Sequence, residues 1–345
     1  MNPAITVFLL LSLGLGTIIT MTSSHWLLAW AGLEMNTLAI IPIISKQHHP
    51  RATEAATKYF LAQATASALI LLSSSMNAWK TGQWDISQLS TPETTIMLTL
   101  ALAMKLGLAP MHFWVPEVLQ GSTLATAMII STWQKLAPTS LLLLTINSLN
   151  PTTLIILGLL STLLGGWLGL NQTQTRKIMA FSSIAHMGWL FTALSINPNI
   201  SLITLITYLL LTMTMFSMLM STASKTLLDL GTTPTLAPTL LTTSMLTLMS
   251  LGGIPPLTGF MPKWLILTEL APMLPTTISC LLALSTLPSL FFYLRMSQMT
   301  TLTLPPKKQL SEYTWRFKTY MLPTIPMIIP ATLLLPMTPL ITNIN

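Results

Sequence analysis

Long apolar runs separated by short polar stretches follow one another along the whole chain. A helix needs about 20 apolar residues to cross the hydrocarbon core of a bilayer, and these runs reach that length. They lack alternating polarity and are about twice as long as the strands of a membrane β-barrel. The pattern therefore predicts an all-α fold, a polytopic transmembrane helical bundle. We expect about eleven spans, near residues 3–22, 26–45, 56–78, 95–120, 122–146, 152–170, 178–196, 200–221, 237–270, 274–296 and 321–342.

The amino-acid composition agrees with a lipid environment. Hydrophobic residues make up 52% of the 345 positions and charged residues only 7%, against about 25% charged in an ordinary soluble domain. The first run has no basic segment before it and is followed at once by a second, so we expect a retained helix and not a signal peptide. We expect a single membrane domain, with two related halves at 1–150 and 151–300 and a loop and last span at 301–345.

The charge distribution indicates topology. A net charge of +7 and a pI near 9.7 would suit a nucleic-acid partner. However, eleven of the fifteen Lys and Arg residues follow even-numbered spans, as in the segments 46–58, 176–177 and 295–318. Such asymmetry marks one side of a membrane, so nucleic acid is excluded as a partner. The even-numbered loops and the N-terminus should share the positive side, with the C-terminus on the opposite side.

The chain offers few groups that hold cofactors. Its one cysteine, Cys280, excludes a disulfide framework and a protein-ligated iron–sulfur cluster. Three of the five histidines lie at span ends, which leaves His112 and His186 without a paired arrangement of haem ligands. Neither a glycine-rich nucleotide loop nor a Ser/His/Asp grouping occurs. We therefore expect no cofactor and no metal ion in this chain.

Four charged residues, Glu34, Lys105, Lys135 and Lys263, lie deep inside expected spans. A charge at bilayer depth costs about 2.5–3.5 kcal/mol on insertion scales, so each one needs a reason. One acid and three lysines exceed what a single structural ion pair would require. Because the charge state of a buried lysine responds to its surroundings, such lysines can carry protons. We favour a proton relay over a purely structural pair between Glu34 and one lysine.

Further titratable residues leave alternatives open. The ring of His186 either passes protons or hydrogen-bonds Ser183 one turn back. His112, next to two aromatic residues, is more typical of a membrane interface than of a relay. Glu117 and Glu269 lie near the ends of interrupted spans. Each is either an entry or exit group for protons or an exposed residue at the end of its span.

An internal repeat places two of the lysines. The segment 104–110 (MKLGLAP) matches 249–255 (MSLGGIP) at four of seven positions with an offset of 145, and 115–118 matches 261–264 with an offset of 146. The two copies fall in an even and an odd span, which predicts an inverted-topology repeat. The proline in each copy should break its helix, because it removes a backbone hydrogen bond. Interrupted spans at matching positions point to an ion path.

Four motifs together carry a resemblance to a known family: GLEMN at 32–36, MKLGLAPMHFW at 104–114, AFSSIAHMGW at 180–189 and LGGIPPLTGF at 251–260. They resemble the proton-conducting, antiporter-like membrane subunits of respiratory complex I. The resemblance extends over almost the whole chain and implies an antiporter-like fold with two broken helices. It also implies a pair between Glu34 and Lys105, a central Lys135 and a terminal Lys263. Bacterial members carry three further N-terminal helices, so the chain looks like the animal mitochondrial form.

The resemblance also implies a function. It suggests a core membrane subunit of a proton-pumping NADH:ubiquinone oxidoreductase in the mitochondrial inner membrane, with the positive side facing the matrix. FMN, iron–sulfur clusters and ubiquinone would be held elsewhere in the complex, so this chain would contain no redox site. Its partners would be the other membrane-arm subunits and the lipid bilayer, including cardiolipin.

Two other functions compete with this interpretation. A free-standing cation/proton antiporter would be expected to carry more mid-span carboxylates than Glu34. A structural membrane scaffold would need no buried lysines.

Overall fold

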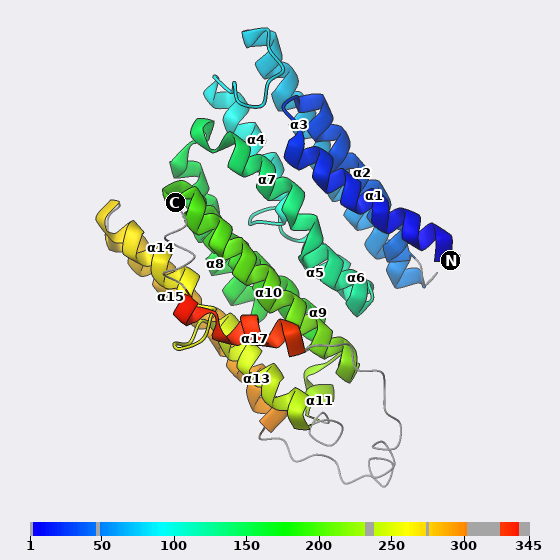
Figure 1. The fold of residues 1–345 in the computed structure, drawn as a ribbon, viewed down its shortest axis with the longest axis vertical. Helices are drawn as coiled ribbons and strands as arrows, with labels where there is room; N and C mark the ends of the chain where they lie inside the picture. The colour runs from blue at the N-terminus through cyan, green and yellow to red at the C-terminus, as the bar shows by residue number, and fades with distance from the viewer. Residues whose placement is uncertain (1–2, 46–48, 232–237, 274–275, 302–324, 338–345) are drawn as a thin grey trace. The chain divides into compact units, whose positions relative to one another are not determined.

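The computed structural model describes residues 3–45, 49–231, 238–273, 276–301 and 325–337, and this part of the chain is almost entirely helical (Figure 1). Seven of its helices are long and apolar enough to cross a membrane. They confirm the all-α membrane fold that the apolar runs predict. The helices form two compact units, Met1–Ser161 and Thr162–Asn345.

The first unit begins with three long helices and continues with two interrupted spans. In chain order its elements are α1 (Pro3–Thr22), α2 (Trp26–Ser45), α3 (Pro50–Thr81), α4 (Pro92–Leu106), α5 (Trp114–Gly121), α6 (Leu124–Ser131), η1 (Trp133–Lys135), α7 (Leu136–Thr145) and η2 (Ile146–Ser148). α4 and α5 share the fourth expected span, and α6, η1 and α7 share the fifth. Helix α8 (Pro151–Gly169) crosses the boundary between the units.

The second unit contains α9, the most deeply buried of the long helices in the described chain. Its elements are α9 (Thr175–Ile196), α10 (Pro198–Thr222), α11 (Leu227–Leu230), α13 (Pro238–Gly252), α14 (Phe260–Met273), α15 (Thr276–Thr301), α17 (Ile325–Leu333) and η3 (Leu335–Met337). In α9, 89% of the most apolar stretch is buried, against 22% in α1. Because so much of α9 is buried, it lies at the centre of the second unit.

Helices α1 and α2 approach each other closely and run side by side (Figure 1). A Cβ atom on Gly16 would lie 2.9 Å from the carbonyl oxygen of Gly32, and a Cβ atom on Gly32 would lie 2.9 Å from that of Gly16. Small residues allow helix backbones in membranes to make such contact. This contact fixes the position of α2, the helix that carries Glu34.

In the second unit, the loops after even-numbered spans meet at one end. An isolated β-bridge joins Gln174 to Thr226. The Arg295 guanidinium, close to the end of α15, donates to the carbonyl oxygen of Leu170 at 2.9 Å. These contacts bring together the ends that the basic residues assign to one side of the membrane. Lys46 and the basic segment 307–318 lie outside the described residues, so their common side stays a prediction.

Within this end of the second unit, the loop after α10 is tied down by a capping box. The Asp229 carboxylate accepts hydrogen bonds from the backbone N–H groups of Thr226 at 2.8 Å and Lys225 at 3.0 Å, and the Thr226 hydroxyl accepts one from Asp229 N–H. Burial acts to raise the pKa of the Asp229 carboxyl, but these donors together hold the pKa below its usual value. The aspartate therefore stays charged and caps α11.

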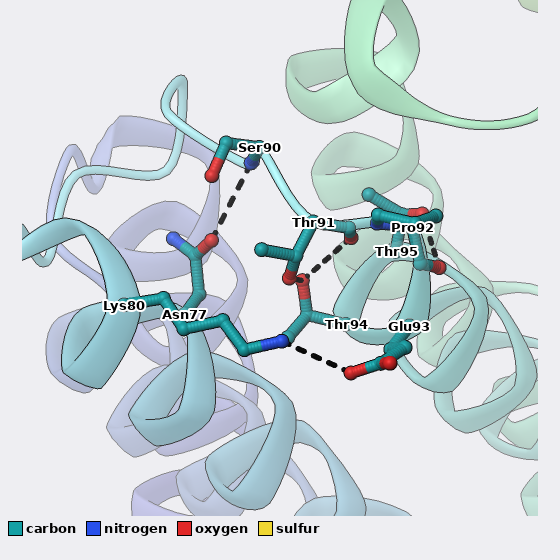
Figure 2. A network of polar contacts seen from close by, with 8 residues as sticks. All are labelled: Asn77, Lys80, Ser90, Thr91, Pro92, Glu93, Thr94 and Thr95. Carbon is teal, nitrogen blue, oxygen red and sulfur yellow. Dashed lines mark hydrogen bonds and ion pairs between the residues drawn. The ribbon is translucent and has the colours of Figure 1, made fainter.

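The connection between α3 and α4 is anchored by a buried asparagine (Figure 2). The fully buried side chain of Asn77 donates to the carbonyl oxygen of Gln88 at 2.7 Å and accepts from the N–H of Ser90 at 3.4 Å. Lys80 and Glu93 add an ion pair at 3.0 Å, with side chains that are 43% and 69% exposed. The network sets where α4 begins, and therefore where its last turn lies.

We expect Asn77→Ala to destabilise the protein much more than Glu93→Ala. The first substitution removes both hydrogen bonds of a fully buried side chain, and each of them contributes about 0.5–1.5 kcal/mol net. The second removes an exposed ion pair, which contributes about 0–1 kcal/mol. Thermal unfolding of the purified protein in detergent measures the difference. Equal shifts of the two unfolding midpoints would contradict the anchoring role of Asn77.

Candidate functional site

The first helix break follows directly after Lys105. Gly107 has φ +76°, in the left-handed region, and ends α4. The N–H groups of Gly107 and Leu108 donate to the carbonyl oxygens of Met104 and Ala103. Glycine is the residue that adopts this conformation without steric cost. The chain then runs without regular helix to the start of α5.

The second break repeats this local geometry. Gly253 has φ +79° and follows the end of α13. The N–H groups of Gly253 and Ile254 donate to the carbonyl oxygens of Ser250 and Met249. In both copies an X–Pro peptide bond in the break is cis, at Ala109–Pro110 and at Pro255–Pro256.

The two breaks correct the register of the internal repeat. The sequence match aligned Gly107 with Gly252 and needed an insertion further on. The structure instead equates Gly107 with Gly253, because these are the residues with positive φ. One offset of 146 then covers the breaks and the segments 115–118 and 261–264 without an insertion. The alignment based on identical residues therefore placed the second copy of the repeat one residue too early.

With this register the two halves carry different charges at equivalent positions. Lys263 corresponds to Glu117, and Lys105 corresponds to Leu251. Glu117 forms an ion pair with Lys58 of α3 at 2.7 Å, and the side chains are 50% and 40% exposed. Glu117 is thus a paired, half-exposed group in the first turn of α5. Glu269, the other acid considered from the sequence, lies partly exposed near the end of α14.

Lys105 is buried, and it makes no direct contact with the expected partner. Its side chain is 5% exposed, and its Nζ has no hydrogen-bond partner among the described residues. The Glu34 carboxylate accepts from the Thr37 hydroxyl on its own helix at 2.8 Å. Its charge still acts on Lys105 electrostatically. The expected pair therefore interacts through the field of Glu34, and no hydrogen bond joins the two side chains.

Lys135 lies at a third helix discontinuity, which we did not predict. The fifth span is interrupted by the 3₁₀ segment η1, and Lys135 is its last residue, 5% exposed. Pro138 explains the interruption, because it lacks the N–H that would bond the carbonyl of Gln134 one turn earlier. The Gln134 side chain lies 3.4 Å from both the Tyr59 hydroxyl and the carbonyl oxygen of Asn36. Lys135 therefore follows a polar bridge between α2 and α3.

In the second unit Lys263 folds back over its break. Its side chain is 8% exposed, and Nζ donates to the carbonyl oxygen of Gly252 at 2.8 Å. The same lysine and His186 line a cavity of about 20 Å³. The Nε2 atom of His186 lies 3.4 Å from the hydroxyl of Tyr293. Lys263 and His186, both candidate relay residues from the sequence, thus line the same cavity.

His112 does not behave as an exposed interface residue. It is 2% exposed and lies inside the first break, where its Nδ1 is 3.2 Å from the carbonyl oxygen of Pro110. Its ring stacks on Phe113 with centroids 4.4 Å apart. In the part of the chain that the structure describes, no group of three His, Cys, Asp or Glu side chains is arranged to hold a metal ion.

Apolar helices broken at glycine and proline, with a buried lysine at each break, define an antiporter-like membrane protein. Residues 23–290 match the family described as NADH:quinone oxidoreductase/Mrp antiporter, transmembrane, and residues 290–342 match the NADH dehydrogenase subunit 2 C-terminus. The chain belongs to the NADH-ubiquinone oxidoreductase chain 2 family. It is 55% identical to the Gallus gallus chain 2 protein, over 99% of both chains.

Solved structures show the same fold. A chain of respiratory complex I from Thermus thermophilus, solved with bound aureothin, superposes with a TM-score of 0.82 at 26% identity, covering 97% of this chain and 80% of that chain. A chain of the Mrp complex from Dietzia sp. DQ12-45-1b has a TM-score of 0.78 at 16% identity, covering 86% of this chain and 60% of that chain. The second likeness is one of fold alone.

Proposed function

We propose that the chain is a core membrane subunit of proton-pumping NADH:ubiquinone oxidoreductase, complex I, and that Glu34, Lys105, Lys135, His186 and Lys263 form its proton relay. The observation that carries this proposal is the burial of three lysines, 5–8% exposed, each at a helix discontinuity. Membership of the chain 2 family over nearly the full length supports the same function. FMN, iron–sulfur clusters and ubiquinone belong to other subunits, and quinone reduction there drives the proton movement.

The helix breaks give this chain a way to hold and release protons. A broken helix leaves backbone carbonyl groups without helical partners, and inside a membrane these groups must face protein or water. At the second break, the carbonyl oxygen of Gly252 accepts a hydrogen bond from the ammonium group of Lys263. Because like charges repel one another, a proton that arrives on one lysine favours release from the next. Each buried lysine can then take up a proton and release it again.

The surroundings proposed for the chain follow from its surface and its charges. Large apolar side chains of α1 are exposed, among them Phe8 at 69% and Leu11 at 61%. Such a face needs lipid or neighbouring membrane-arm subunits to cover it. In the mitochondrial inner membrane the basic loops and the N-terminus would face the matrix, with the C-terminus on the intermembrane-space side. Cardiolipin is the expected anionic lipid there.

The alternatives fit these observations less well. A free-standing antiporter shares the fold with the Mrp chain, but the sequence identity is 16%, against 55% for the chain 2 relative. A purely structural scaffold gives no reason for Lys105, whose buried Nζ has no hydrogen-bond partner among the described residues. Burying an ammonium group without a hydrogen-bond partner is costly, so a function of the lysine explains its position better.

Replacing Lys135 tests the relay in the intact complex. Lys135→Arg keeps the positive charge but cannot release a proton in the physiological range, and Lys135→Met removes the titratable group. We expect both variants to assemble and to pump several-fold fewer protons per NADH oxidised. NADH-driven proton translocation in reconstituted vesicles, normalised to complex content, is the measurement.

The exposed Lys80 provides the matched control, because Lys80→Met also removes one lysine from the first unit. This control should pump normally. Normal pumping by Lys135→Arg as well would mean that proton release from Lys135 is not required.

A further inference from the structure

The second unit contains a small, partly open cavity between α9, α10 and α14, and most of its wall is apolar. It has a volume of about 20 Å³ and is lined by His186, Lys263, Tyr208, Thr204 and Thr207, together with apolar side chains. A cavity needs about 10–15 Å³ and two to four polar partners to hold a water molecule. The volume is sufficient for one water molecule, and His186, Lys263, Tyr208, Thr204 and Thr207 supply polar groups in the wall.

Two buried tyrosines contact the same imidazole, and one of them, Tyr208, also lines the cavity. The hydroxyl of Tyr293, on α15, lies 3.4 Å from Nε2 of His186. The ring of Tyr208, on α10, is tilted against the His186 ring with centroids 5.6 Å apart. The hydroxyl of Tyr208 interacts with the side chain of Ser183, and that of Tyr293 with the side chain of Ser182. Three helices thus fix the orientation of His186.

Packing alone does not account for these hydroxyl groups. Tyr208 is 2% exposed and Tyr293 is 1% exposed, and a buried hydroxyl is costly unless it is hydrogen-bonded. Phe292, the neighbour of Tyr293 on α15, is also 1% exposed, so this part of the bundle accommodates phenylalanine. Hydrogen bonds with Ser183 and Ser182 offset that cost for Tyr208 and Tyr293, and the Tyr293 hydroxyl also reaches Nε2 of His186. The hydroxyls therefore point to a role in the site.

We propose that Tyr293 and Tyr208 are positioning residues that hold the His186 ring at the cavity wall, where one water molecule links it to Lys263. This inference rests on the proposed proton relay. In the step it describes, the Lys263 ammonium gives a proton to the water while the water gives one of its own to the imidazole. The water is unchanged, and one proton has moved from lysine to histidine.

Tyr293→Phe in the intact complex tests the inference, because it removes one oxygen atom and keeps the ring. Assembly should be unaffected, and coupled proton translocation should slow about fivefold to tenfold, the effect of losing one hydrogen bond. Ser289→Ala is the matched control on the same helix, since the Ser289 hydroxyl donates to the carbonyl oxygen of Thr286, one turn back on α15. It should translocate protons normally.

A double-mutant cycle separates positioning from packing. If Tyr293 acts through the imidazole, Tyr293→Phe should add nothing to the defect of His186→Gln, because residues in one network are not additive. Effects that multiply would overturn the inference. Should Tyr293→Phe fail to assemble, the same cycle with Tyr208→Leu decides, because leucine lacks the ring that contacts His186. A water-resolved map of the complex should show density in the cavity, and a dry cavity would also overturn the inference.

Lys263→Met distinguishes this inference from the proposed function. Loss of translocation in Lys263→Met together with normal translocation in Tyr293→Phe would remove the positioning role and leave the relay intact. Normal translocation in Lys263→Met would remove the relay itself.

Discussion

Replacing Gly259 by alanine is expected to prevent stable assembly of the chain. A Cβ atom at this position would overlap the carbonyl oxygen of Ser250 and lie 2.6 Å from its carbonyl carbon. Both atoms belong to the backbone of α13, so no side-chain rotation relieves the contact. Gly259 also directly precedes α14, the helix that carries Lys263. We expect a cost of about 4 kcal/mol or more, in the range reserved for severe backbone disruption.

Two other glycines provide graded controls for this prediction. A Cβ atom on Gly14 would meet nothing within 4 Å, so Gly14→Ala should be neutral or slightly stabilising. At Gly253 the added atom would lie 2.8 Å from the flexible end of Lys263, but the backbone has φ +79°. The left-handed conformation costs an alanine about 1–2 kcal/mol, which places Gly253→Ala between the two. The measurement is the amount of assembled complex on native gels, and equal amounts for Gly259→Ala and Gly14→Ala would contradict the prediction.

The membrane fold and the burial of the lysines could be predicted because both depend on local sequence. A run of apolar residues long enough to span a bilayer predicts a helix by itself, and seven such helices are present in the described chain. Gly107 and Pro110 act on their own stretch of backbone, so the first break could be located from the sequence. The low exposure of Lys105, Lys135 and Lys263 followed from their depth in the spans.

The signal for the third discontinuity was present in the sequence but was not used. Pro138 lies inside an apolar run, and its effect appears one turn earlier, at Lys135. A proline within a membrane helix breaks the hydrogen bond to the carbonyl four residues before it. However, Pro42 and Pro288 lie inside α2 and α15, which continue as helices, so a proline alone does not locate the 3₁₀ segment.

Side-chain partners could not be predicted, because they depend on how separate helices pack. Tyr293 is one more aromatic residue in an apolar run, and only the packing of α15 near α9 brings its hydroxyl to His186. The distance between Glu34 and Lys105 likewise depends on side-chain conformation. On α2 the nearby Thr37 hydroxyl binds the carboxylate, which no pattern along the chain indicated.

The largest loss of coupled proton transfer is expected for Lys263→Met. Nζ of Lys263 donates to the carbonyl oxygen of Gly252, and the side chain lines the cavity shared with His186. This lysine therefore joins the helix break to the cavity that holds His186. Methionine keeps the apolar volume and removes the titratable group, while arginine keeps the charge but retains its proton. Loss of a proton-transfer group typically slows a reaction by about a hundredfold or more.

The measurement is proton translocation driven by NADH oxidation in vesicles that contain the reconstituted complex, compared with the NADH oxidation rate of the same preparation. Lys225→Met is the matched control, because Lys225 is an exposed lysine of the same unit, outside the long helices. It should translocate protons normally, whereas both Lys263→Met and Lys263→Arg should not. Because arginine can replace the charge of Lys263 but not its proton release, normal translocation by Lys263→Arg would show that the charge alone is sufficient.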